Sequence, residues 1–268
     1  MALQELPPPP AELRHSSLPG WSRLDDLFHS IAWSKREGVT YASGTWGYTV
    51  LRTAHSAVAN DLWPSALDKL HRWVSRYFIH YERMGKDLPN GTIDDELGRR
   101  FALEVVDVDP ERVTLPNDLT KATQEDIKAL DAVFEEWVCR AIGAETAARF
   151  QRRYNPRFWD FLVVDEKSLR SLAELPDETP PVQLVSLRER LARKDLYVWA
   201  YVWLVDSQAV RRFRGFTDAE NYNGLMKLSA DSIDSAWFAR LLTFEDDHAI
   251  FNREEFPKGS GELWYTSA

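Results

Sequence analysis

The first residue that could carry chemistry is an aspartate inside an apolar strand pattern. Asp160 stands within RFWDFLVVD, residues 157–165. A carboxylate among apolar side chains is costly to ionise unless a cation or water accompanies it. Burial of this kind raises the pKa of a carboxyl, and a raised pKa is typical of a general acid or base. Asp160 is therefore a catalytic candidate, with a solvated edge position or a salt bridge to Arg52 or Arg157 as the structural alternative.

The second acid or base candidate is His55, which directly follows a predicted strand. The other histidines form no metal motif. His71 and His80 share a predicted helix, but their spacing places them on nearly opposite faces. His248 lies beside two aspartates, although adjacent carboxylates in a charged loop are usually solvated. The sequence holds no H-E-x-x-H, paired C-x-x-C, G-x-S-x-G or glycine-rich phosphate loop. We therefore predict no metal and no cofactor.

An aromatic strand pattern predicts a ligand-binding wall. In LYVWAYVWLVD, residues 196–206, alternation places four aromatic side chains on one face: Tyr197, Trp199, Tyr201 and Trp203. Trp46 and Tyr48 would extend this wall if their strand were a neighbour. Such side chains suit a pocket for a flat apolar or aromatic small molecule, because each joins a large apolar body to a polar group. The alternative is that both strand faces are buried under helices.

Composition excludes several classes of protein. The 268 residues are 44% hydrophobic and 28% charged, which is ordinary for a folded soluble domain and unlike a disordered chain. No stretch approaches the roughly 20 apolar residues that cross a membrane. The net charge of −9 is unlike that of a protein that binds phosphate backbones. We therefore interpret the basic run RRFRGF, residues 211–216, as a local loop patch and predict no nucleic-acid partner.

Two features favour a cytoplasmic protein. The start MALQELPPPP lacks the basic and apolar segments of a secretory signal. The chain has one cysteine, Cys139, so it can form no internal disulfide.

The elements that must position these residues alternate along the chain. We predict strands at 45–53, 100–108, 157–165 and 196–206, and helices at 21–37, 60–84, 120–142 and 166–175. The helix at 120–142 opens with a capping box from Thr123 to Asp126. Residues 207–232 are predicted as loop and turn, and 236–265 as strand or irregular structure.

This order predicts an α+β fold. Two β-α-β units are typical of a ferredoxin-like sheet with helices on one face, and the helix at 120–142 would be inserted between the halves. Residues 1–40 would form a proline-containing arm and a short helix, and residues 41–268 a single domain. Because ferredoxin-like sheets often pair, a homodimer is also expected.

Three motifs carry a family resemblance. They are Trp46, Gly47, Tyr48, Arg52 and Thr53, with Trp63 in the following helix; Arg157, Phe158, Val164, Asp165, Glu166 and Leu169; and the terminal pair Trp264 and Tyr265. They resemble a large family of uncharacterised proteins from filamentous fungi, over about residues 43–265. Where that family has a tyrosine after Arg-Thr, this chain has Ala54 and His55. The resemblance implies a shared fold and no reaction.

Two functions follow from these observations. The favoured one is a small-molecule-binding or cofactor-free tailoring protein with an aromatic pocket, walled by Trp199, Tyr201 and Trp203, with Asp160 or His55 as acid or base. The alternative is a protein-interaction or scaffold module without catalysis, which would use the proline arm, the first helix and the acidic surface. The sequence leaves open whether the protein is an enzyme.

Overall fold

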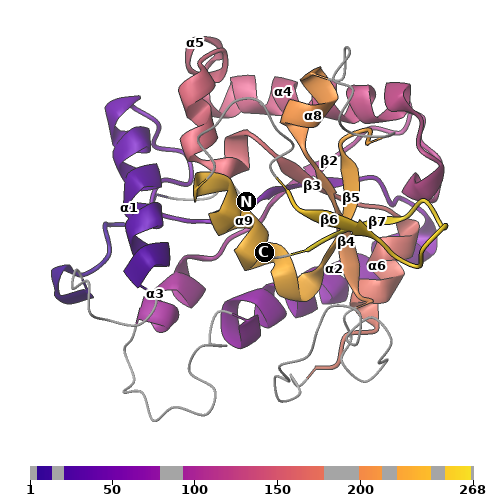
Figure 1. Ribbon diagram of the computed structural model, residues 1–268, viewed down its shortest axis with the longest axis horizontal. Helices are drawn as coiled ribbons and strands as arrows, with labels where there is room; N and C mark the ends of the chain where they lie inside the picture. The colour runs from indigo at the N-terminus through magenta and orange to yellow at the C-terminus, as the bar shows by residue number, and fades with distance from the viewer. Residues whose placement is uncertain are drawn as a thin grey trace.

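A mixed sheet lies at the centre of the protein (Figure 1). It has seven strands in the order β2-β1-β3-β4-β5-β7-β6. The computed structural model describes residues 5–13, 21–78, 93–177, 199–212, 222–242 and 251–266. The strands are β1 (Thr49–Arg52), β2 (Glu104–Asp107), β3 (Phe161–Val164), β4 (Tyr201–Val205), β5 (Leu225–Ser229), β6 (Arg253–Glu255) and β7 (Leu263–Tyr265). The fold is therefore of the α+β kind that the sequence predicts.

Helices cover both faces of this sheet. They are α1 (Trp21–Arg36), α2 (Ala57–Arg72), α3 (Ile93–Arg100), α4 (Gln124–Ile142), α5 (Ala144–Ala147), α6 (Glu166–Ala173), α8 (Ser207–Arg212) and α9 (Ile233–Leu242). Helices α2, α6 and α9 supply the hydrophobic core on one face, and α4 supplies most of the helical core on the other. Two separate cores result, one on each side of the sheet.

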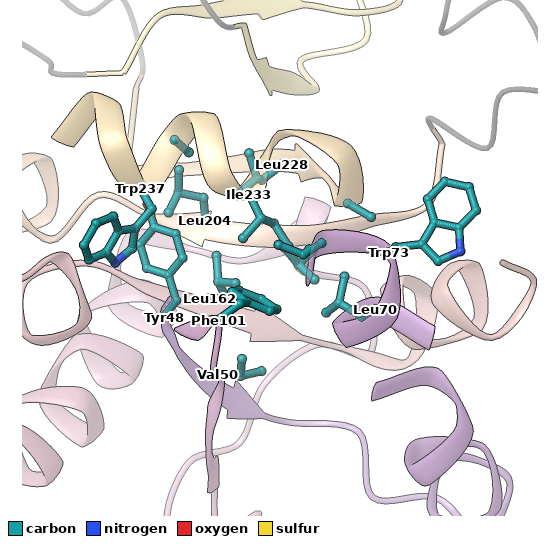
Figure 2. Packing of buried hydrophobic residues seen from close by; sticks show 14 of the residues in the cluster. Tyr48, Val50, Leu70, Trp73, Phe101, Leu162, Leu204, Leu228, Ile233 and Trp237 are labelled. Carbon is teal, nitrogen blue, oxygen red and sulfur yellow. The ribbon is translucent and has the colours of Figure 1, made fainter. Parts of the chain in front are cut away.

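The alternation of β3 and β4 explains the two cores. Leu162 and Leu204 point to the α2 side, whereas Phe161 and Trp203 point to the α4 side. Successive side chains of a strand point to opposite faces, so a strand covered on both faces reads as a continuous apolar run. Figure 2 shows the first core, where Leu162 and Leu204 of the sheet lie among side chains of α2 and α9.

The parallel part of the sheet is wound in two directions. β1 lies between β2 and β3 and is parallel to both. The chain passes from β1 through α2 to β2, then through α4 on the other face to β3. The strand order therefore reverses beside β1, as in doubly wound α/β sheets. This corrects the ferredoxin-like prediction, which placed the helices on one face only.

Some segments differ from the elements that the sequence predicts. The stretch 207–232, predicted as loop and turn, contains α8 and the fully buried strand β5. In the stretch 236–265, predicted as strand or irregular structure, residues 236–242 belong to α9, whereas β6 and β7 are strands as predicted. The capping box of α4 is confirmed, since Thr123 Oγ1 and the Asp126 carboxylate bond to each other's backbone N–H.

The proline segment is anchored to the rest of the chain. Leu6 N donates to Ser43 O at 2.8 Å, and the fully buried Arg100 donates through Nη2 to Pro7 O at 2.6 Å. Helix α1 buries Leu24 and Leu27 in the core on the α2 side of the sheet. In the part of the chain that the structure describes, no helix combines the length and the apolar character needed to cross a bilayer.

Candidate functional site

The six aromatic candidates do not form one wall. Trp46 and Tyr48 are fully buried in the core on the α2 side, while Tyr201 and Trp203 belong to the core on the α4 side. Strand β3 separates β1 from β4. The two pairs therefore lie on opposite faces of the sheet and are not neighbours. Trp199 is half-buried, and Tyr197 lies outside the described residues.

A lysine side chain from the neighbouring strand β5 occupies the aromatic face of β4. Lys227 of β5 pairs across the sheet with Trp203 and is buried. Its ammonium lies 4.7 Å from the ring centre of Tyr201, 5.5 Å from that of Trp203 and 5.3 Å from that of Trp264. The carboxylate of Glu262 forms its ion pair. We call these residues the Lys227 cage; such aromatic cages favour cations.

Asp160 is also engaged within the protein. Its carboxylate is fully buried and is paired with Arg240 of α9, and Ser207 N donates to it at 3.2 Å. The expected partners Arg52 and Arg157 bond elsewhere: Arg52 pairs with the Asp107 carboxylate, and Arg157 donates to backbone carbonyl oxygens. Burial raises the pKa of Asp160 to about 6, against the opposing charge of Arg240.

A cleft lies at the carboxyl ends of the three parallel strands. It has a volume of about 610 Å³ and lies between the β1–α2 turn, the β3–α6 turn and the long loop after β2. Its lining includes His55, Ser56, Asp118, Glu166 and Arg170. Open α/β sheets bind their ligands at this edge, where the strand order reverses and the connections diverge to opposite faces. We call it the switch-point cleft.

Hydrogen bonds between two cleft residues join the β1–α2 turn to the β3–α6 turn. Ser56, the N-cap of α2, donates from its backbone N to Glu166 Oε1 at 3.1 Å and from its hydroxyl to Glu166 Oε2 at 3.0 Å. The same hydroxyl accepts from Ala59 N at 3.1 Å. Glu166 thus places a carboxylate at the start of α2, where negative charge is favourable.

A buried aspartate fixes the second turn. Asp165 is the N-cap of α6 and accepts from Ser168 N at 2.8 Å. Its other oxygen accepts from Leu119 N and from the Trp203 indole, each at 3.0 Å. The aromatic strand β4 therefore supports the cleft from behind through Trp203, although it does not line it.

His55 belongs to the cleft, as its position after a strand suggested. Its Nε2 lies 2.8 Å from Val108 O, a backbone acceptor, so this nitrogen carries the proton in the neutral ring. Among the described residues, Nδ1 has no hydrogen-bond partner and is left as an acceptor. His55 does not bond to Ser56, so these two residues do not form a nucleophile–base pair.

The charged side chains that α6 and the loop after β2 contribute to the cleft are partly balanced. Lys167 Nζ lies 3.3 Å from Asp118 Oδ2. Burial would raise the pKa of Asp118, but hydrogen bonds from Thr120 and the charge of Lys167 hold it below the ordinary value. Arg170, one turn along α6, is exposed and has no ion pair within the described ranges. The cleft thus offers a cation, an imidazole acceptor and a carboxylate beside the apolar side chains of Val113 and Leu115.

The sequence contained a signal for the cleft residues that the prediction missed. Asp165 and Glu166 directly follow the strand at 157–165, and Ser56 follows the strand at 45–53. Had these strands been placed parallel and adjacent, their carboxyl ends would have met at one edge. The described part of the chain holds no cluster of three or more metal-ligating side chains.

Comparison with known proteins identifies no relative. No protein-family model matches the chain, no curated protein matches it, and no solved structure matches it.

Proposed function

We propose that this protein binds a small polar molecule in the switch-point cleft. The observation that carries the proposal is the cavity of about 610 Å³ at the carboxyl ends of β1, β2 and β3, at the reversal of strand order. Polar groups from two of the turns converge there, and the loop after β2 adds the apolar side chains of Val113 and Leu115. The aromatic pocket expected from the sequence is replaced by this cleft, because Lys227 occupies the aromatic face of β4.

The groups in the cleft favour binding over nucleophilic catalysis. The hydroxyl of Ser56 donates to a carboxylate and accepts from the backbone of its own helix. A ligand that presents an acidic group to Arg170 and a hydrogen-bond donor to His55 Nδ1 fits the two groups left without partners in the described chain. The Glu166 carboxylate adds a hydrogen-bond acceptor to the cleft lining.

Native mass spectrometry after incubation with a cytosolic metabolite extract tests this proposal. We expect a discrete added mass that the double variant His55→Ala, Arg170→Ala loses. The matched control is His29→Ala, Arg36→Ala, which changes the same residue types in a second cavity, of about 800 Å³, beside α1. That control should keep the added mass. No added mass, or its loss in the control alone, would contradict the proposal.

One observation favours the alternative of an interaction module. The backbone of the proline segment is anchored, yet Pro7, Pro8 and Pro10 expose their rings. Exposed prolines on a fixed backbone suit a partner with an aromatic-lined groove. A partner captured by the native chain and lost by the variant Pro8→Ala, Pro10→Ala would support this function, and equal capture by both would count against it.

We further propose that the protein acts in the cytoplasm, because its one cysteine permits no internal disulfide. We also propose that the protein forms a homodimer and shares the fold of the fungal family that its motifs resemble.

A further inference from the structure

A buried group of polar residues lies at the edge of the sheet opposite the switch-point cleft. Asp160 precedes β3, and Asp206 follows the antiparallel strand β4, so the two carboxylates meet at one end of neighbouring strands. Arg240 of α9 reaches both. Tyr48, Tyr222 and Ser207 also lie at this end, because each precedes or follows a strand there. We call these six residues the Asp160 chamber.

The ion pairs of the chamber are unbalanced. Arg240 Nη2 donates to Asp160 Oδ1 at 2.5 Å and to Asp206 Oδ1 at 3.3 Å. All three side chains are at most 1% exposed. Two carboxylates therefore share one guanidinium, so the chamber carries one excess negative charge when both are ionised. Such a charge is costly in a buried site.

Several polar atoms of the chamber have no partner within the described chain. They are the Tyr48 and Tyr222 hydroxyls, Ser207 Oγ, Asp206 Oδ2 and Arg240 Nη1, and all five are buried. Buried polar atoms are nearly always hydrogen-bonded, and those that are not mark a site that accommodates something more. Burial raises the pKa of both tyrosines well above the ordinary value, so they stay neutral hydroxyls that can donate or accept.

The charged groups outside the chamber do not cancel its excess negative charge. Arg211 of α8 acts on Asp160 from a distance, but it is paired with Asp131 of α4. The guanidinium of Arg253 from β6 lies over the Tyr222 ring, 3.9 Å from its centre, and neither chamber carboxylate forms an ion pair with it. Tyr265 of β7 faces Tyr48 as a neutral hydroxyl.

We propose that the Asp160 chamber is a buried proton-binding site whose occupancy controls how firmly α9 and the β4–α8 turn are attached to the sheet. A proton from solvent forms an O–H bond on one of the two carboxylates and leaves one balanced ion pair with Arg240. The new O–H can donate to an unpartnered oxygen of the chamber. The attachment is tighter with the proton bound, because no unbalanced charge then stays buried.

The direction of the pH dependence follows from the folded and unfolded states. Asp160 has a pKa of about 6 in the folded protein and an ordinary value of 3.8. The folded state therefore keeps this proton over a pH range in which the unfolded state has released it. The contribution of the chamber to attachment is full below about pH 4 and is lost as the pH rises through about 6.

Hydrogen exchange of the α9 amides tests the proposal. Measured at about pH 5 and about pH 7.5 and corrected for intrinsic rates, exchange of α9 should be about tenfold slower at the lower pH. The lower pH lies about one unit below the pKa of Asp160 in the folded protein, and each unit is worth about tenfold. In Asp160→Asn the difference should disappear, because one carboxylate and one guanidinium are then left in balance. Equal protection at both pH values in the native chain would overturn the proposal, as would an undiminished difference in Asp160→Asn.

Two further variants separate charge from packing. Asp206→Asn removes the other carboxylate and should also abolish the difference, which keeps the test valid if Asp160→Asn does not fold. Tyr48→Phe removes a chamber hydroxyl without changing any charge, so it should retain the difference. If Tyr48→Phe lost the difference in exchange between the two pH values, the difference would result from packing, and this would contradict a proton-binding site.

Discussion

At the scale of single residues, the structure gives the aromatic side chains of β4 a different role from the one their pattern suggests. Tyr201 and Trp203 surround the ammonium of Lys227, which is supplied by the neighbouring strand. Trp203 also donates its indole hydrogen to Asp165, so one side chain joins the Lys227 cage to the switch-point cleft. The cage is therefore a structural support of the cleft.

Removing the caged cation should destabilise the protein. We expect Lys227→Met to lower the free energy of unfolding by about 1–3 kcal/mol, because three ring contacts are lost and Glu262 loses its ion-pair partner. Urea denaturation followed by tryptophan fluorescence measures this. The double variant Lys227→Met, Glu262→Gln should recover part of the loss, since it leaves no unpaired carboxylate. Native stability in Lys227→Met would show that the cage contributes nothing.

Asp160 shows why a residue pattern alone misleads about chemistry. The sequence correctly marked it as a carboxylate among apolar neighbours, and its pKa is raised as expected. Its partner Arg240, however, lies in α9, 80 positions along the chain. Arg52 and Arg157, the partners predicted from the sequence, bond elsewhere. Strand register and helix placement decide which side chains meet.

At the scale of elements, two N-terminal caps illustrate the difference between local and tertiary stabilisation. The cap of α4 is exposed and consists of Thr123 and Asp126 bonding to each other's backbone. The cap of α6 is buried, and Asp165 additionally accepts hydrogen bonds from Leu119 and Trp203. Both caps satisfy free N–H groups of a first turn, but only the second also connects three parts of the fold.

This difference predicts unequal effects of removing the caps. We expect Thr123→Ala to cost about 1 kcal/mol of unfolding free energy, the ordinary value for an exposed cap. Asp165→Ala should cost about 3 kcal/mol or more, because it also leaves the Trp203 indole and the Leu119 N–H buried without an acceptor. Chemical denaturation of the two variants under one set of conditions makes the comparison. Equal losses would mean that Asp165 acts as a local cap alone.

At the scale of the whole molecule, the proline segment is part of the folded structure. Pro9 is buried, and the Pro7 carbonyl accepts from the fully buried guanidinium of Arg100. The close approach requires a glycine, because a Cβ at Gly44 would stand 2.6 Å from Leu6 O. The first residues of the chain thus complete the hydrogen bonds of a buried arginine.

Deletion of residues 1–10 should therefore lower the melting temperature. Arg100 would lose an acceptor and Pro9 its buried contacts, which corresponds to about 1–3 kcal/mol, or about 3–10 °C for a chain of this size. Circular dichroism during heating measures the shift. Pro8→Ala, which changes an exposed ring, should leave the melting temperature unchanged. An unaltered melting temperature after the deletion would contradict the anchored segment.

The sequence by itself determined the local features of this protein. Four strands and the helices α1, α2, α4 and α6 lie within or close to the predicted ranges, because side-chain periodicity and capping residues act over a few positions. The capping box at Thr123 was legible for the same reason. The immediate neighbours of Asp160 indicated either a buried carboxylate or a solvated one, and the structure buries it.

Only the tertiary structure decided which of these features meet. The parallel pairing of β1 with β2 and β3 placed His55, Ser56 and Glu166 at one edge, although Ser56 and Glu166 are 110 positions apart. The burial of both sheet faces turned an expected ligand wall into the Lys227 cage. Strand order and register depend on contacts between distant segments, and residue patterns of short range do not specify those contacts.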